Sequence, residues 1–487
     1  MNRRDLFKRL GGTGAAAAAI AGGEAFWQVF GHAEPLEAAQ SAVRRGLSPV
    51  KITDVKVFLT QVGGAQFCNV KVLTDEPGLY GIGDGNHAER VSIVGQTITE
   101  FLKPLVVGRR VDEIEDIWQT LWVAPYWRHD IDANNAMAAI DGALWDIMGK
   151  RAGMPVYQLL GGKVRPGCRM FANAGGQSLQ NLEDNCRALM AQGYQHIRLR
   201  ALGGGGGDGD GGGGGGGRGG GRGGGGGAGG RGGGAGAAGR GNGAGRIGNA
   251  GPTAPQSGAQ NGARRQDSVF INGVVQEFEH LRKTIGFDLE LGYDVHEYPH
   301  PTGALILAKA LEPTRPFFIE DLFAPEDVYW YQKVREESSI GIAMGELFVN
   351  RAEWLPLVKN RWIDFFRGHI SAMGGLNMAR KAARVCEFYN VRTAWHGPNN
   401  VSPVGHAINL HVDLASYNFG IGEGDNFNDQ IKELFPGVPE IRNAIRYAND
   451  QPGLGVDINE TVAARYPLTA PGSNRGARGE DGEPRRP

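Results

Sequence analysis

Short apolar runs alternate with amphipathic stretches along the larger, second part of the chain. Eight runs have the length of buried strands: Arg169–Ala174, His196–Ala201, Phe287–Tyr293, Pro316–Ile319, Ile340–Met344, Trp362–Phe366, Val391–Trp395 and Asn418–Ile421. The stretches between them, such as Leu179–Gln192 and Leu376–Phe388, repeat apolar residues at the spacing of one helix face. Strand–helix alternation predicts a parallel sheet with crossover helices, and eight such units in about 250 residues predict a (β/α)8 barrel over residues 166–425. A doubly wound open sheet is the alternative, but no Gly-x-Gly-x-x-Gly follows a strand and opens a helix.

The region before the barrel has a different pattern and predicts an α+β domain over residues 46–165. Val55–Leu59 and Phe67–Leu73 alternate apolar and polar positions like strands. Helical periodicity follows at Arg90–Leu105 and again at Asn134–Arg151. The second of these helices is rich in small residues, which predicts close packing against another helix.

A glycine tract interrupts the barrel pattern after its second strand. The chain has 80 glycines, and 33 of them lie in Gly203–Gly251. Such a tract cannot bury a core, so residues 203–264 are expected to form a disordered insertion in a loop. Arginines in the tract also allow single-stranded nucleic-acid binding, but the tract has no aromatic residue on which bases could stack.

The two ends of the chain are expected to lie outside the folded part. Residues 1–45 begin with Arg3-Arg4 and continue through a weakly apolar, Ala/Gly-rich run, which is typical of a twin-arginine signal peptide. This predicts export to the periplasm. Residues 471–487 are rich in Gly, Arg, Glu and Pro, and a disordered tail is expected there.

Composition excludes several classes of protein. The 487 residues carry 51 Lys+Arg against 52 Asp+Glu, which argues against a globally basic nucleic-acid binder. The four cysteines are far apart and form no CxxC pair, so neither a zinc ribbon nor a small disulfide scaffold is expected. The sequence has no window of 18 apolar residues, so no membrane span is predicted.

One carboxylate stands at the end of each of three successive runs. These residues are Asp294, Glu320 and Glu346, and neighbours are 26 residues apart. The carboxyl ends of barrel strands meet at one face, where barrel enzymes have their active sites. Three carboxylates at one point repel each other unless a cation lies between them, and an all-oxygen set suits Mg²⁺. The spacing therefore predicts a magnesium site.

Other strand ends add polar groups to the same face: Arg198 and Arg200, Arg367, His396 and Glu423, together with His296 two residues past Asp294. Histidines beside a metal site are candidates for proton transfer. A divalent cation next to such groups suits removal of a proton α to a carboxylate, because the cation neutralises the negative charge that forms.

The chain resembles the enolase superfamily, and more closely its mannonate dehydratase-like subgroup of acid-sugar dehydratases. The resemblance covers about residues 50–202 and 265–460. The motifs that carry it are Trp145-Asp146-Ile147, Pro155–Gly162, Asp294-Val295-His296, Glu320-Asp321, Gly345-Glu346 and Trp395-His396-Gly397-Pro398.

The resemblance implies a fold and a reaction. It implies that residues 46–165, together with residues 426–470, form a capping domain over a modified barrel. It implies Mg²⁺ held by Asp294, Glu320 and Glu346. It also implies loss of water from a mannonate- or gluconate-like acid to give a 2-keto-3-deoxy acid. By the pattern of the family, His296 is the acid and Arg198 is the partner of the base. We also expect a homo-oligomer.

The sequence departs from this subgroup at three points. The base should be a tyrosine in the loop after the second strand, but no tyrosine occurs between Arg198 and Tyr293. Asn173 stands where the family has a histidine, and Asn400 where it has an aspartate. We expect both asparagines, with Arg200, Arg367 and Glu423, to contact the substrate. His396 or Arg200 could replace the missing base.

Three alternatives stay open beside the dehydratase. A racemase or epimerase would use the same proton abstraction, with bases on both faces of the substrate. A non-catalytic barrel that binds a sugar acid is consistent with the missing tyrosine, because a fold does not determine function. A third alternative is an RNA-associated protein that uses the glycine tract.

Overall fold

A computed structural model describes residues 48–86, 90–126, 128, 130–200, 202, 267–398 and 401–469. The expected signal peptide, the glycine insertion, Asn400 and the C-terminal tail lie outside the described residues. All the helices and strands below belong to the second of two units of the chain, which begins at Lys51. Within the described residues, no helix is long and apolar enough to cross a membrane.

An antiparallel sheet opens this unit, in the order β1-β2-β3. Its strands are β1 (Ile52–Val62), β2 (Ala65–Thr74) and β3 (Tyr80–Asp84). The first two confirm the strands expected from alternation. The long helix α7 (Ile131–Ala152) begins at the N-cap Asp130, whose side chain accepts the backbone N–H of Asp132.

Helix α7 packs closely against strand β3 and not only against helices. A Cβ atom at Gly81 or Gly83 of β3 would lie 1.9 or 1.8 Å from a backbone carbonyl oxygen of α7. Gly142 of α7 faces Ile408 on the barrel side. The expectation of helix packing alone was therefore incomplete, because small residues allow any backbone to approach closely. The glycines of β3 and the small residues of α7 act together in this contact.

Shorter helices complete the first domain: α4 (Val91–Gln96), the π-helix η2 (Thr97–Leu102), α5 (Lys103–Val106), α6 (Ile114–Val123) and α8 (Val156–Leu159). The predicted helix at residues 90–105 is thus a run of three helical segments. Helix α6 ties this domain to the barrel, because Trp118 donates its indole N–H to the carbonyl of Gly374 at 2.7 Å.

Seven parallel strands form the barrel sheet in the order β11-β10-β9-β8-β7-β6-β5. They are β5 (Ala172–Ala174), β6 (His196–Leu199), β7 (Glu290–Asp294), β8 (Phe318–Glu320), β9 (Ile342–Met344), β10 (Phe365–Phe366) and β11 (Arg392–Thr393). The eighth predicted run closes the ring through parallel bridges from Phe419 to Thr393 and from Gly422 to Met170. The closed barrel is confirmed, and the open sheet is excluded.

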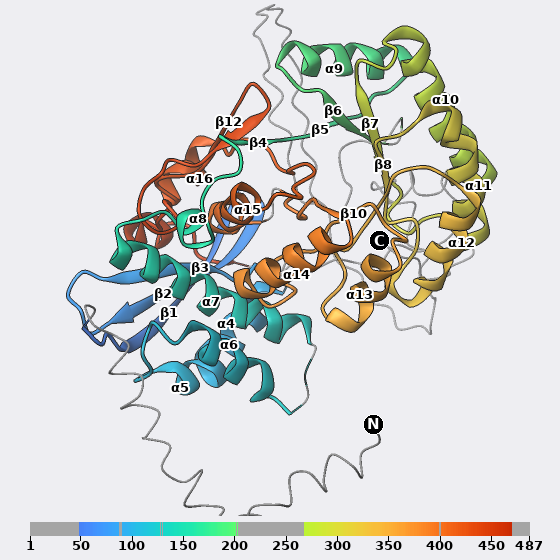
Figure 1. Cartoon of the computed structure of the whole chain (residues 1–487). Coiled ribbons are helices and arrows are strands. Elements are labelled where there is room, and N and C mark those ends of the chain that lie inside the picture. The colour runs from blue at the N-terminus through green and yellow to red at the C-terminus, as the bar shows by residue number, and fades with distance from the viewer. Residues whose placement is uncertain are drawn as a thin grey trace, which may run out of the picture. The chain divides into compact units, whose positions relative to one another are not determined.

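Helices cover the outside of this barrel (Figure 1). They are α9 (Leu179–Ala191), α10 (Asp267–Thr284), α11 (Pro301–Leu311), α12 (Tyr329–Glu337), α13 (Arg351–Lys359), α14 (Leu376–Phe388) and α15 (Pro403–Ala415). Short 3-10 turns, η5 (Glu312–Thr314) and η6 (Pro325–Asp327), lie beside α11 and α12. Aromatic and small apolar side chains form a buried cluster on the strands: Phe171, Phe318, Ala343, Phe365, Ala394 and Ile421. This apolar cluster lies under the polar residues at the strand ends.

The C-terminal segment contributes α16 (Asp429–Leu434), β12 (Glu440–Arg442), β13 (Ile445–Tyr447) and α17 (Glu460–Ala463). Strands β12 and β13 form a small sheet with β4 (Cys168–Arg169). The segment then contacts the first domain, where Lys71 pairs with Glu460 at 2.9 Å and Asp146 accepts the backbone N–H of Leu454 at 2.7 Å. Residues from both ends of the fold thus meet on one side of the barrel.

Candidate active site

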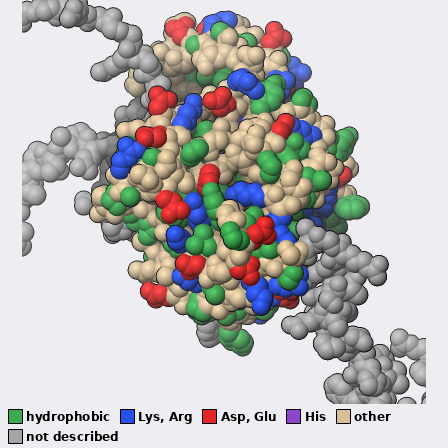
Figure 2. Space-filling view, turned by 90° about the vertical axis from the view of Figure 1, so that its left-hand side faces the viewer, with side chains coloured by type: hydrophobic (Ala, Val, Ile, Leu, Met, Phe, Trp, Pro, Cys, Tyr) green, Lys and Arg blue, Asp and Glu red, His purple; other side chains and the backbone are tan. Residues whose placement is uncertain are grey.

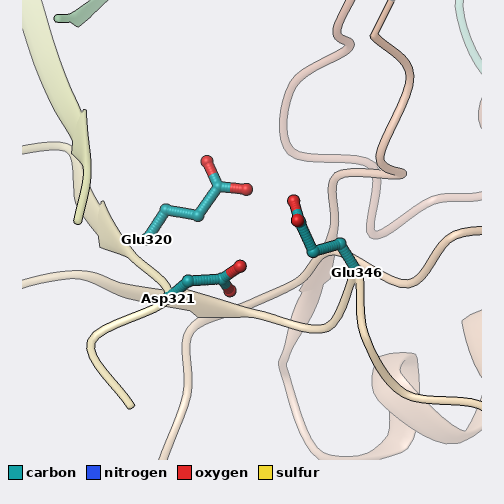
Figure 3. A group of neighbouring side chains, drawn as sticks. All are labelled: Glu320, Asp321 and Glu346. Carbon is teal, nitrogen blue, oxygen red and sulfur yellow. The ribbon is translucent and has the colours of Figure 1, made fainter. Parts of the chain in front are cut away.

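Carboxylates gather where β7, β8 and β9 end. Asp294 and Glu320 are the last residues of their strands and are direct partners in the sheet register. Glu346 lies two residues past β9. Glu320, Asp321 and Glu346 each offer an oxygen within 4.8 Å of the others, and Figure 3 shows the three side chains converging. Asp321 was not among the residues predicted from the sequence.

Arg198, at the end of β6, links three acidic residues. Its guanidinium lies 3.3 Å from Asp294, 3.0 Å from Glu320 and 3.1 Å from Glu423. Its Nε donates to the side-chain oxygen of Asn173 at 2.8 Å. Arg198 is buried, so these contacts form away from bulk water. Asn173 therefore positions the guanidinium.

Arg367, which follows β10, makes a second set of ion pairs. Its side chain is fully buried, its Nε donates to Glu320, and its Nη2 lies 2.6 Å from Glu423. Although burial alone would raise the pKa of Glu423, the guanidiniums of Arg367 and Arg198 hold that pKa below its ordinary value. Glu423 also accepts the backbone N–H of Gly397 at 2.9 Å. The two arginines thus share Glu320 and Glu423.

Two histidines flank Glu346. His296 Nε2 lies 3.6 Å from one of its oxygens, and His396 Nε2 lies 3.2 Å from the other. The side chain of His396 also contacts His369, with 2.8 Å between the two Nδ1 atoms, so one nitrogen must donate and the other accept. Sequence reasoning missed His369. The signal was present, because His369 follows Arg367 by two residues, as His296 follows Asp294.

Burial and crowding perturb the pKa values of these groups. Burial, followed by the charge of Glu320, raises the pKa of Asp294 to about 7, although Arg198 opposes this shift. The close contact with the Glu346 carboxylate raises the pKa of His296 to about 11. Burial would raise the pKa of Glu346, but His396 and His296 lower it overall. Burial and repulsion between the acidic groups thus favour a proton on Asp294, whereas contact with Glu346 favours the charged form of His296.

The residues present fit a divalent cation. Five carboxylates surround two guanidiniums: Asp294, Glu320, Asp321, Glu346 and Glu423 beside Arg198 and Arg367. Both oxygens of Asp321 are buried and have no hydrogen-bond partner among the described residues. Hard oxygen donors with excess negative charge are the set that Mg²⁺ prefers.

Two predicted residues need separate mention. Arg200 lies just past the end of β6, where its backbone N–H donates to the carbonyl of Ala174 at 2.8 Å and its side chain is half-buried. Asn400 lies outside the described residues. The other predicted substrate and catalytic residues all take part in the contacts above.

The chain matches known protein families over most of its length. Residues 263–462 match the family described as enolase C-terminal domain-like, and residues 40–161 match the mandelate racemase / muconate lactonizing enzyme N-terminal domain. A D-galactonate dehydratase family member from Musicola paradisiaca is 42% identical over 421 residues, which is 86% of this chain and 95% of that protein. Another from Enterocloster bolteae is 39% identical over 420 residues, covering 86% and 94%.

The chain is also similar to a solved structure. The crystal structure of an enolase from Pantoea ananatis with bound D-gluconate and Mg is 41% identical, with a TM-score of 0.77, and the match covers 90% of this chain and 100% of that one. The chain belongs to the D-galactonate dehydratase family of the enolase superfamily.

Proposed function

We propose that this protein is a Mg²⁺-dependent dehydratase of a sugar acid of the gluconate, galactonate or mannonate class, with a 2-keto-3-deoxy acid as product. One observation carries the proposal: a buried carboxylate cluster at the strand ends has a histidine on either side of Glu346. The family relatives named as D-galactonate dehydratase family members and the related structure with D-gluconate and Mg support it.

The proposed Mg²⁺ site consists of Asp294, Glu320 and Glu346. When bound there, Mg²⁺ supplies the positive charge that stabilises an α-deprotonated carboxylate substrate. The arginines hold the acidic side chains in place, because each guanidinium bridges at least two of them.

The two histidines divide the proton transfers. His296 is held in its protonated form by its contact with Glu346, so we assign it as the acid that protonates the departing 3-hydroxyl. His396 is the base in place of the missing tyrosine, and its Nε2 faces the cluster. The α-proton moves to this nitrogen, and the hydroxyl leaves as water with the proton of His296.

A turnover screen tests the proposal. Purified protein with Mg²⁺ is incubated with D-gluconate, D-galactonate, D-mannonate and related aldonic acids, and 2-keto-3-deoxy products are assayed. We expect one acid to be converted, EDTA to abolish turnover, and Glu346→Gln to lower kcat by about 100-fold or more. Glu115→Gln, on the exposed face of α6, is the matched control and should retain activity.

Other outcomes identify the alternatives. Exchange of the α-proton with solvent deuterium, without a keto product, would indicate a racemase or epimerase. No turnover or exchange across the panel, with calorimetric binding of a sugar acid still present, would indicate a non-catalytic binding barrel. On the face in Figure 2, acidic and basic side chains are intermixed, which does not favour a nucleic-acid surface.

Two further properties of the chain are proposed from its sequence. Residues 1–45 direct export by the twin-arginine route. A reporter fused to them should leave the cytoplasm, and Arg3→Lys with Arg4→Lys should block export; a reporter that ignores this change contradicts the proposal. We also propose a homo-oligomer, and a monomeric mass by light scattering would exclude it.

A further inference from the structure

Asp321 has an unusual backbone position next to the carboxylate cluster. It follows Glu320 at the end of β8. Its backbone φ is 49°, in the left-handed region that residues other than glycine rarely adopt. Its backbone is held from both sides: its N–H donates to Ala343 at 3.1 Å, and its carbonyl accepts from Glu297 at 2.8 Å. These bonds direct its side chain toward Glu320 and Glu346 (Figure 3).

The carboxylate of Asp321 lacks the partners that buried carboxylates normally have. The residue is 1% exposed, and neither side-chain oxygen has a hydrogen-bond partner among the described residues. Burying a carboxylate without partners is costly. Asp146, equally buried, shows the usual solution: its oxygens accept hydrogen bonds from two backbone N–H groups and from Lys150.

The surroundings of Asp321 add to this cost. Its carboxylate lies within 4.8 Å of oxygens of Glu320 and Glu346, two groups that carry charge of the same sign. Like charges at this distance destabilise each other unless a cation lies among them. A strained backbone that holds an unpartnered carboxylate against two others indicates a binding role.

We propose that Asp321 is a fourth carboxylate of the Mg²⁺ site, with its oxygens facing the cation and the water molecules that the cation keeps. Mg²⁺ retains several waters in protein sites, and those waters need acceptors. This inference rests on the cation of the proposed function and is independent of the reaction that follows.

Asp321→Asn tests the proposal, because it removes the charge and keeps the shape. Mg²⁺ binding to the purified full-length protein is measured by calorimetry without substrate. We expect the dissociation constant for Mg²⁺ to rise about 10- to 100-fold, as it does when groups around a metal site are lost. Should this variant fail to fold, Asp321→Ser serves the same purpose and should shift affinity in the same direction.

Thermal unfolding supplies a readout that a structural role would not produce. In EDTA, Asp321→Asn should melt at a higher temperature than the wild type, because repulsion from Glu320 and Glu346 is relieved. The rise in melting temperature caused by Mg²⁺ should be smaller in the variant, because that rise depends on affinity. A structural carboxylate would instead lower the melting temperature in EDTA when replaced.

Asp141→Asn is the matched control. Asp141 is also buried and has one unpartnered oxygen among the described residues, but it lies on α7 and accepts the backbone N–H of Asn377 at 2.8 Å. Its replacement should leave Mg²⁺ affinity unchanged. Affinity of Asp321→Asn within about twofold of the wild type would overturn the proposal. Weakened Mg²⁺ binding in a protein without any turnover would uphold it while the proposed function fails.

Discussion

Glu423 forms ion pairs with both buried arginines of the site. It lies 2.6 Å from Arg367 and 3.1 Å from Arg198, and it is 4% exposed. Glu423→Gln keeps the size of the side chain and an oxygen that can still accept the N–H of Gly397. The perturbation is therefore the loss of one negative charge between two buried guanidiniums.

The magnitude follows from these distances. Two unit charges 4 Å apart interact by about 4 kcal/mol at an effective dielectric constant of 20. Two effects offset part of the free energy lost with these two pairs. Folding of the variant no longer removes a charged carboxylate from water, and both arginines still contact Glu320. Removing one partner of a buried pair costs 3–5 kcal/mol in general, and we expect about 3 kcal/mol here.

Urea unfolding in EDTA, followed by fluorescence and circular dichroism together, measures this loss without interference from bound cation. Glu115→Gln is the control, because its pair with Lys381 at 2.6 Å is about half exposed and should contribute less than about 1 kcal/mol. A loss for Glu423→Gln no larger than that of the control would refute the view that the arginines need this carboxylate.

Three further predictions concern His369 in the site and His411 and Gly83 elsewhere in the fold. His369→Phe should lower kcat about 100-fold with little change in KM, because His396 loses its contact with His369. His369→Asn should recover part of the loss. An equal effect of both substitutions would argue against the view that His369 positions His396. Burial lowers the pKa of His411 to about 4 from 6.5, so the unfolded chain takes up more protons as the pH falls below 6.5. Wild type should then lose about 2 kcal/mol more stability than His411→Gln between pH 7 and 5, by urea unfolding. Gly83→Ala should destabilise the fold by more than about 3 kcal/mol, because the new Cβ would overlap the carbonyl of Ala139. The control Gly273→Ala, on the open side of α10, should stabilise it by about 0.5–1 kcal/mol. Similar melting temperatures of the two variants would contradict the prediction.

The barrel could be predicted from the sequence because its strands and helices are each marked by a pattern within a short segment. Helix α14 has the predicted bounds, and Gly375, which has a positive φ, precedes it. The partner of α7 was harder to predict. Small residues indicate that something approaches closely, but only the folded chain shows that β3 does so through Gly81 and Gly83.

The candidate site was predictable where strand ends alone decide it. Asp294, Glu320 and Glu346 follow from the repeat spacing. Asp321 could not be found in this way, because the residue after a strand end ordinarily points away from its neighbour. Its left-handed backbone, held by Ala343 and Glu297, reverses that expectation, and those contacts join distant parts of the sequence.

The division into metal, substrate and catalytic residues also changes once the contacts are known. Arg198 was expected to assist the base, yet its guanidinium is shared by Asp294, Glu320 and Glu423, two of which are expected to hold the cation. A cation held by Asp294 and Glu320 would therefore share these carboxylates with Arg198, and its binding would change the electrostatic contribution of Arg198. Substitutions here will be non-additive. Burial strengthens these charge interactions, so the effect of replacing one residue of the site depends on which of its partners remain.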